Sequence, residues 1–257
     1  MSSSSVARSS LLSVDILPII QAFQCGLYED LLPSHRTWNQ TRTRFDSKRQ
    51  QTMCQAPQES TELAVDEYFV DDVTDRSFPL HHAIVHGSLS LVQRWIQCRG
   101  REIVTRYAMD CAAAHGQMAI LQWLHHRNFS GCTTDAMDFA ALRGHLNVVT
   151  FLHCHRAEGG RFLAMDFAAG QGHLDVVKYL HTHRREGCST MAMDAAASNG
   201  HLDVLVFLHT HRREGFTSKA IEGAKKYGHH DIAAYLQSIS AARLEALVAP
   251  HAQVTAA

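Results

Sequence analysis

Histidine is the residue type in this chain that most suggests chemistry, because 19 of the 257 residues are histidines and many recur at fixed spacing. One set directly follows a recurring glycine and consists of His145, His173, His201 and His229. A second set comes as His-x-His pairs, which are His153/His155, His181/His183 and His209/His211. Imidazole nitrogens ligate zinc and titrate near neutral pH, so metal binding and pH response are the chemistries to consider.

Helix geometry disfavours a zinc site within either histidine set. Zinc is usually held by four ligands at about 2.0–2.3 Å. Residues two apart on a helix point roughly 200° apart, so the two rings of a His-x-His pair do not reach one ion. Equivalent residues of packed helices are separated by roughly 8–10 Å. We therefore predict no bound metal, with one alternative: a mixed site of His183, Cys188 and His211, formed by a loop that folds back.

No motif for catalysis or cofactor binding is present: the chain lacks a P-loop, GxSxG, GxGxxG, HExxH and zinc-finger spacing. The seven cysteines include no CxxC pair, which is typical of reduced thiols in a reducing compartment. The net charge of −1 provides no overall attraction to nucleic acid or to anionic membranes. We therefore predict an intracellular protein, cytoplasmic or nuclear, that is not an enzyme and binds no cofactor, nucleic acid or membrane.

The elements that position these residues form an internal repeat. Glycines recur every 28 residues, after a first interval of 29, at Gly87, Gly116, Gly144, Gly172, Gly200 and Gly228. Around them the sequence nearly repeats itself: residues 164–181 read AMDFAAGQGHLDVVKYLH and residues 192–209 read AMDAAASNGHLDVLVFLH. Self-similarity at such a period is typical of stacked repeats.

Each repeat predicts two short helices joined by the glycine. In the third repeat the first helix is predicted from about Ala136 to Arg143, and the second carries Leu146, Val149 and Leu152 inward. Glycine suits the left-handed residue that ends a helix. Helices this short are marginal alone, so stacking must stabilise them. We predict an all-α helical repeat solenoid of six helix–turn–helix units with short loops.

Three further sequence patterns predict structural roles for the residues that form them. Asp138, Asp166 and Asp194 are predicted in the first turn of their helices, where the helix dipole stabilises negative charge. Recurring arginines near glutamates are predicted to form ion pairs between repeats; they are Arg156, Arg184, Arg185, Arg212 and Arg213. Gly170 lies inside a predicted first helix, so its replacement by alanine is predicted to be neutral or stabilising.

The repeats resemble the ankyrin family. Residues 78–83 read FPLHHA, followed by Gly87, which resembles the ankyrin T-P-L-H-x-A signature and its glycine turn. Residues 172–177, GHLDVV, resemble the opening of the second ankyrin helix. The later repeats contain Ala-Met-Asp in place of Pro-Leu-His, and each is shorter than the ankyrin period of about 33 residues. The resemblance covers residues 77–237, and we infer tight loops in place of the projecting ankyrin hairpins.

The flanks of the repeats define the remaining organisation. Residues 1–76 are predicted to be an N-terminal region, partly disordered, with a helical segment near 11–33. Residues 77–237 form the predicted ankyrin-like solenoid, and residues 238–257 a C-terminal helix or disordered tail.

The resemblance implies a protein-interaction module that binds a partner on its concave face. The candidate contacts are residues where the repeat varies, namely Arg106, Tyr107, His115, Leu142, Arg143, Phe162, Gln171, Met191, Asn199 and Lys219. The partner is another protein, and the chain is expected to be a monomer. Two alternatives remain: an adaptor that tethers a client to an enzyme through residues 11–58, and a metal- or pH-responsive histidine-rich module.

Overall fold

The computed structural model describes residues 77–129 and 131–252, and for residues 242–252 it describes the backbone alone. All regular structure within these ranges is helical. The chain divides into two units, Met1–Thr133 and Thr134–Ala257. The helix predicted near 11–33, the disorder predicted for part of residues 1–76 and the adaptor segment 11–58 lie outside the described residues.

The described part of the first unit contains two helix–turn–helix repeats and a short 3₁₀ helix. The elements are α4 (Phe78–Val85), α5 (Leu89–Arg99), η2 (Arg101–Ile103), α6 (Tyr107–Ala114) and α7 (Met118–His126). Pro79 lies in the first turn of α4, where its missing N–H removes no helical hydrogen bond.

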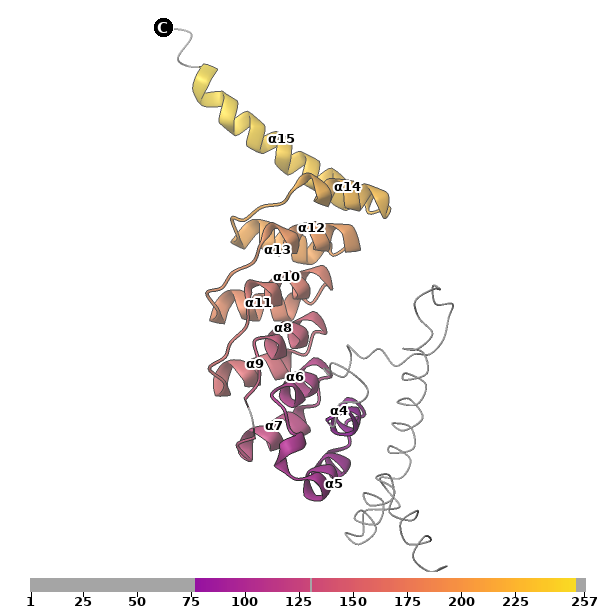
Figure 1. Cartoon of the computed structure of the whole chain (residues 1–257). Coiled ribbons are helices and arrows are strands. Elements are labelled where there is room, and N and C mark those ends of the chain that lie inside the picture. The colour runs from indigo at the N-terminus through magenta and orange to yellow at the C-terminus, as the bar shows by residue number, and fades with distance from the viewer. Residues whose placement is uncertain (1–76, 130, 253–257) are drawn as a thin grey trace, which may run out of the picture. The chain divides into compact units, whose positions relative to one another are not determined.

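The second unit contains four repeats (Figure 1). The elements are α8 (Asp135–Leu142), α9 (Leu146–His155), α10 (Phe162–Gly170), α11 (Leu174–His183), α12 (Thr190–Asn199), α13 (Leu202–His211), α14 (Ser218–Lys226) and α15 (His230–Ala252). With the two repeats of the first unit this makes six helix–turn–helix repeats, so the predicted all-α repeat fold is confirmed.

We call the first helix of each repeat its A helix and the second its B helix. In the second unit the A helices α8, α10, α12 and α14 pack side by side in one layer (Figure 1). Their contact is close because small side chains lie between them: Ala168, Ala169, Ala196 and Ala197 are completely buried. The alanines of the A helices therefore set the spacing of the stack.

The B helices contribute the larger apolar side chains. In α9 the residues Val148, Val149, Phe151 and Leu152 are buried, whereas Leu146, which was predicted to point inward, is only half-buried. The final B helix, α15, has 23 residues against 10 in α13, and it continues past Gln237 to Ala252.

The turn glycines all have a positive φ, as the sequence predicts. Gly172 has φ 79°, a conformation that residues with a side chain rarely adopt. Gly170 differs from the prediction made for it. It is buried at the end of α10, and a Cβ there would lie 3.0 Å from Cβ of Ala195 on α12. Because this approach is tight, we now expect Gly170→Ala to destabilise the protein.

Candidate functional site

The A helices carry the predicted contact residues at a regular spacing. On a helix, positions i, i+4 and i+8 lie on one face. In α12 these positions are Met191, Ala195 and Asn199, and in α14 with its cap they are Lys219, Gly223 and Tyr227. The equivalent residues of the other two repeats of the second unit are Asp135, Phe139, Arg143, Leu163, Phe167 and Gln171. We call these twelve residues, together with the exposed Phe162 beside Leu163, the A-helix face.

The N-terminal end of this face is apolar in its middle repeats. Phe162, the first residue of α10, has 46% of its surface exposed, and Met191 of α12 has 42% exposed. Lys219 of α14 is exposed as well. The caps fix two of these positions, because Ser189 Oγ accepts a hydrogen bond from Met191 N at 3.1 Å and Thr217 Oγ1 accepts one from Lys219 N at 3.2 Å.

The C-terminal end of the face is polar and partly engaged in the stack. The backbone oxygen of Leu142, itself half-buried, accepts a hydrogen bond from His173 Nε2 at 3.2 Å. Asn199 Nδ2 donates to the oxygen of Gly170 at 2.6 Å, so this side chain links two repeats. Arg143 and Gln171 are exposed. Asn199 is exposed as well, so of the predicted residues at this end only the half-buried Leu142 is poorly accessible.

The first unit contains the remaining predicted residues. Arg106 and Tyr107 hold each other: Nη2 of the arginine donates to the tyrosine hydroxyl at 3.0 Å, and the guanidinium lies 5.0 Å from the ring centre. His115 caps the C-terminus of α6 and is half-buried. Tyr107 and His115 occupy the same two repeat positions as Met191 and Asn199.

Two aromatic residues of the A-helix face were missed from the sequence. Phe139 and Phe167 are half-buried at the central position of α8 and α10. The equivalent residues of the next two repeats are Ala195 and Gly223, so the centre of the face changes from bulky to small along the stack. Tyr227 is 60% exposed beside Lys226, whose ammonium lies 5.2 Å from the ring centre. The variation of this central position was the signal that the sequence offered.

The aspartates of the A helices accept hydrogen bonds from the loop that follows. This role differs from the interaction with the helix dipole that was predicted for them. Asp138 lies in the first turn of α8, as predicted, but Asp166 and Asp194 do not lie in the first turn of their helices. Asp166 is buried and accepts hydrogen bonds from Ser189 N at 2.8 Å and Ser189 Oγ at 2.6 Å. Asp194 accepts the same two bonds from Thr217, at 2.8 and 2.6 Å. The aspartates therefore connect each repeat to the next.

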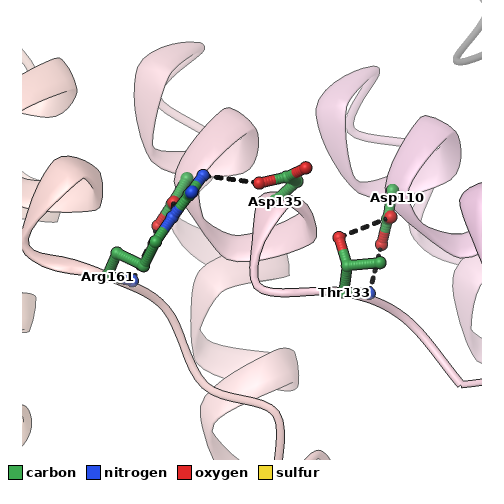
Figure 2. Close-up of polar contacts among 5 residues, drawn as sticks. Asp110, Thr133, Asp135 and Arg161 are labelled. Atoms are coloured by element: carbon green, nitrogen blue, oxygen red, sulfur yellow. Dashed lines mark hydrogen bonds and ion pairs between the residues drawn. The ribbon is translucent and has the colours of Figure 1, made fainter.

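Figure 2 shows two further members of this series, one in each unit. In the first unit the backbone N and Oγ1 of Thr133 both donate to Asp110, each at 2.8 Å. In the second unit Arg161 replaces the hydroxyl residue: its backbone N donates to Asp138 at 2.9 Å and its Nε at 2.7 Å, and its Nη2 reaches Asp135. Burial raises the pKa of Asp138 and of Asp166, while the hydrogen bonds from Arg161 and Ser189 oppose that rise.

Among the described residues, three of the recurring arginines form ion pairs within one loop, whereas ion pairs between repeats were predicted. Arg156 pairs with Glu158, Arg184 with Glu186 and Arg212 with Glu214. The sequence did not suggest that Arg161 is the arginine that reaches the aspartates of the A helices.

Both histidine sets have structural contacts. In the second unit, the imidazoles of His173, His201 and His229 each lie against the turn glycine of the preceding repeat, as His173 does against Gly144. At the ends of the B helices, Phe151, Tyr179 and Phe207 stack on histidines four residues later, at ring-centre distances of 4.3–4.4 Å. His183 Nδ1 also donates to the oxygen of Tyr179 at 3.0 Å.

No group of three histidine, cysteine, aspartate or glutamate side chains that fits a metal ion occurs among the described residues. The alternative zinc site of His183, Cys188 and His211 therefore receives no support from the geometry. Burial, with a smaller contribution from Glu214, raises the pKa of Cys188 to about 11, which disfavours the thiolate that zinc requires.

The fold and the repeated contacts define a class of protein built from stacked helix–turn–helix repeats. The family described as Ankyrin repeats (many copies) matches residues 109–153, 137–181 and 165–209. Residues 109–209 are therefore similar to the ankyrin-repeat family. A search of curated proteins gave no match to the chain. Ankyrin repeats are general protein–protein interaction modules and are typically not enzymatic.

None of the helices in the described part of the chain has the length and apolarity needed to cross a membrane.

Proposed function

We propose that this protein is a non-enzymatic interaction module that binds a partner protein on the A-helix face of its second unit. The observation that carries the proposal is the exposure of large apolar side chains on the A helices and their caps: Phe162, Met191 and Tyr227 are 46%, 42% and 60% exposed. Apolar side chains grouped at a surface mark interaction sites more often than single ones do.

The composition of the face suits a protein partner. Aromatic residues, methionine and arginine are enriched in protein interfaces, and the A-helix face holds Phe139, Phe167, Met191, Tyr227 and Arg143. Four A helices at a spacing of about 10 Å span roughly 30–40 Å, which accommodates an interface of standard size, about 800 Å² per partner.

The backbone of the stack fixes where these side chains lie. The carboxylate of each A helix binds the start of the next one, as Asp166 binds Ser189 and Asp194 binds Thr217. A face held in this way loses little conformational freedom when a partner binds, which favours affinity. The variable side chains then determine which partner is bound.

A matched pair of double variants tests this proposal. The protein is used to capture partners from cell extract, and the captured protein is identified, purified and titrated by calorimetry. Phe162→Ala with Met191→Ala is expected to weaken binding at least about a hundredfold, as loss of central apolar anchors does. The control is Leu202→Ala with Val206→Ala, two apolar residues of α13 that are 37% and 39% exposed.

The control pair is expected to leave the dissociation constant unchanged within about threefold, and both variants are expected to keep their helical content. Loss of binding in the control pair alone would assign the partner to the B helices. Unchanged binding in both pairs would exclude the A-helix face.

A further inference from the structure

The loops that follow the B helices of the second unit form a series of their own. Each begins with an arginine paired to a glutamate two residues later, as Arg184 is with Glu186. A glycine with positive φ follows, with angles of 70°, 73° and 75° at Gly159, Gly187 and Gly215. The three loops are therefore built alike.

Each later loop covers the glycine of the loop before it. A side chain on Gly159 would overlap Nη2 of Arg184, and one on Gly187 would overlap Nη2 of Arg212. Arg184 Nη1 also lies 3.4 Å from Nδ1 of His153 in the preceding repeat. As a result, a cavity of only about 10 Å³ remains beside Gly160, Arg184 and Glu186.

The series ends at the loop that contains Gly215. The position 28 residues after Arg212 is Ser240, which lies within α15, so the chain forms no fourth loop of this kind. An open hollow of about 610 Å³ remains beside Gly215. Its lining includes His209, Arg212, Arg213, Phe216, Ile239 and Met193. Small-molecule and peptide-sized sites commonly enclose about 300–1,000 Å³.

The hollow is cationic on one side and apolar on the other. Arg212 is paired with Glu214, but the guanidinium of Arg213 makes no ion pair or hydrogen bond with any described residue, and Arg213 is exposed. Among the residues whose side chains the structure describes, no carboxylate lines the hollow. Phe216 and Ile239 are half-buried and provide apolar surface.

We propose that this hollow is a binding site for a peptide segment of a partner protein that carries a carboxylate next to a bulky aliphatic side chain. The planar guanidinium of Arg213 binds the carboxylate through two parallel hydrogen bonds. The aliphatic side chain packs on Phe216 and Ile239, and its apolar surface is thereby removed from water. The hollow contains no residue of the A-helix face, so this proposal is independent of the function proposed above.

The test uses the full chain and fluorescein-labelled hexapeptides in which glutamate alternates with leucine, isoleucine, valine or methionine. Fluorescence anisotropy is expected to show saturable binding of at least one of these four peptides. Replacement of its glutamates by glutamine is expected to weaken binding about tenfold or more, because the charge-assisted hydrogen bonds are lost.

Two arginine variants locate the site. Arg213→Ala is expected to weaken binding of the best peptide about tenfold. Arg185→Ala is the control, because Arg185 holds the equivalent position in the preceding loop, is exposed and does not line the hollow. It is expected to leave binding unchanged, while Ile239→Asp abolishes it. Equal losses in the two arginine variants, or no saturable binding of any of the four peptides, would overturn the proposal.

Discussion

The imidazole of His201 fills the space that a side chain on Gly172 would need. A Cβ at Gly172 would lie 2.5 Å from Nδ1 of His201. The turn glycine is therefore required for two separate reasons, its φ of 79° and the approach of the next repeat. Gly228 has a similar φ of 84°, yet no side chain of the described residues, its chain neighbours aside, lies within 4 Å of the position of its Cβ.

Alanine at these two glycines separates the two requirements. Gly228→Ala is expected to lower the free energy of unfolding by about 1–2 kcal/mol, the cost of a left-handed residue with a side chain. Gly172→Ala is expected to cost about 1–3 kcal/mol more, because it also overpacks the contact with His201. Urea denaturation followed by circular dichroism measures both values.

A double variant provides the control for this prediction. Removing the imidazole in Gly172→Ala with His201→Ala is expected to recover part of the loss, since the clash then disappears while the φ strain stays. Equal losses for Gly172→Ala and Gly228→Ala, with no recovery in the double variant, would mean that φ alone requires the glycine.

The aspartates of the A helices allow a second comparison between repeats. Asp166 and Asp194 accept the same two hydrogen bonds, from Ser189 and from Thr217, but Asp166 is only 1% exposed whereas Asp194 is half-buried. Removing a buried acceptor leaves its donors unsatisfied. Asp166→Ala is expected to lower the free energy of unfolding by about 2–3 kcal/mol, and Asp194→Ala by about 1 kcal/mol.

Thermal and urea denaturation of the two variants check this difference. Because the donors are the same types of group at the same distances, the comparison isolates burial. A larger loss for Asp194→Ala than for Asp166→Ala would contradict it.

The glycine period was sufficient to predict the fold. It placed the turns, and the apolar residues on either side of Gly144 then placed the two helices of the repeat. The variable positions also identified both ends of the A-helix face, such as Met191 and Asn199. These features depend on local backbone preference and helical periodicity, which one sequence reveals.

Contacts between repeats were harder to predict. Asp166 was assigned to the helix dipole because the sequence does not show which group lies beside it after stacking. The constant separation of 23 residues from Asp110 to Thr133 and from Asp166 to Ser189 was the available signal. Phe139 and Phe167 were missed because a phenylalanine within an apolar helix is more often buried than exposed.

The last prediction concerns pH and His181, a member of the second histidine set. Its Nδ1 is buried and has no hydrogen-bond partner among the described residues. The rings of Phe207 and His211 lie against it at 5.5 and 5.7 Å. Burial lowers the pKa of His181, and the charges of Arg212 and His211 lower it further, while Glu214 opposes them.

The sign of the effect on stability follows from linkage. The folded state holds the proton on His181 less tightly than the unfolded state, in which the pKa is about 6.5. Its contribution to stability is therefore present above that pH and is lost as the pH falls through 6.5 toward the lowered value. The pKa values of Asp138 and Asp166 are raised above the ordinary value of 3.8, so the contributions of these two carboxyl groups to stability increase as the pH falls. They do so in a more acidic range than the range in which the contribution of His181 is lost.

A His181→Gln variant isolates this contribution from those of the other histidines. The difference in free energy of unfolding between the wild-type protein and the variant is expected to shrink as the pH falls from about 7.5 to about 5.5, since only the wild type has the His181 contribution to lose. Urea denaturation at four or five pH values across this window measures the difference, and NMR titration of the imidazole protons reports the pKa of His181 directly. A difference that stays constant with pH, together with a pKa of His181 at or above 6.5, would show that this histidine does not make the stack sensitive to acid.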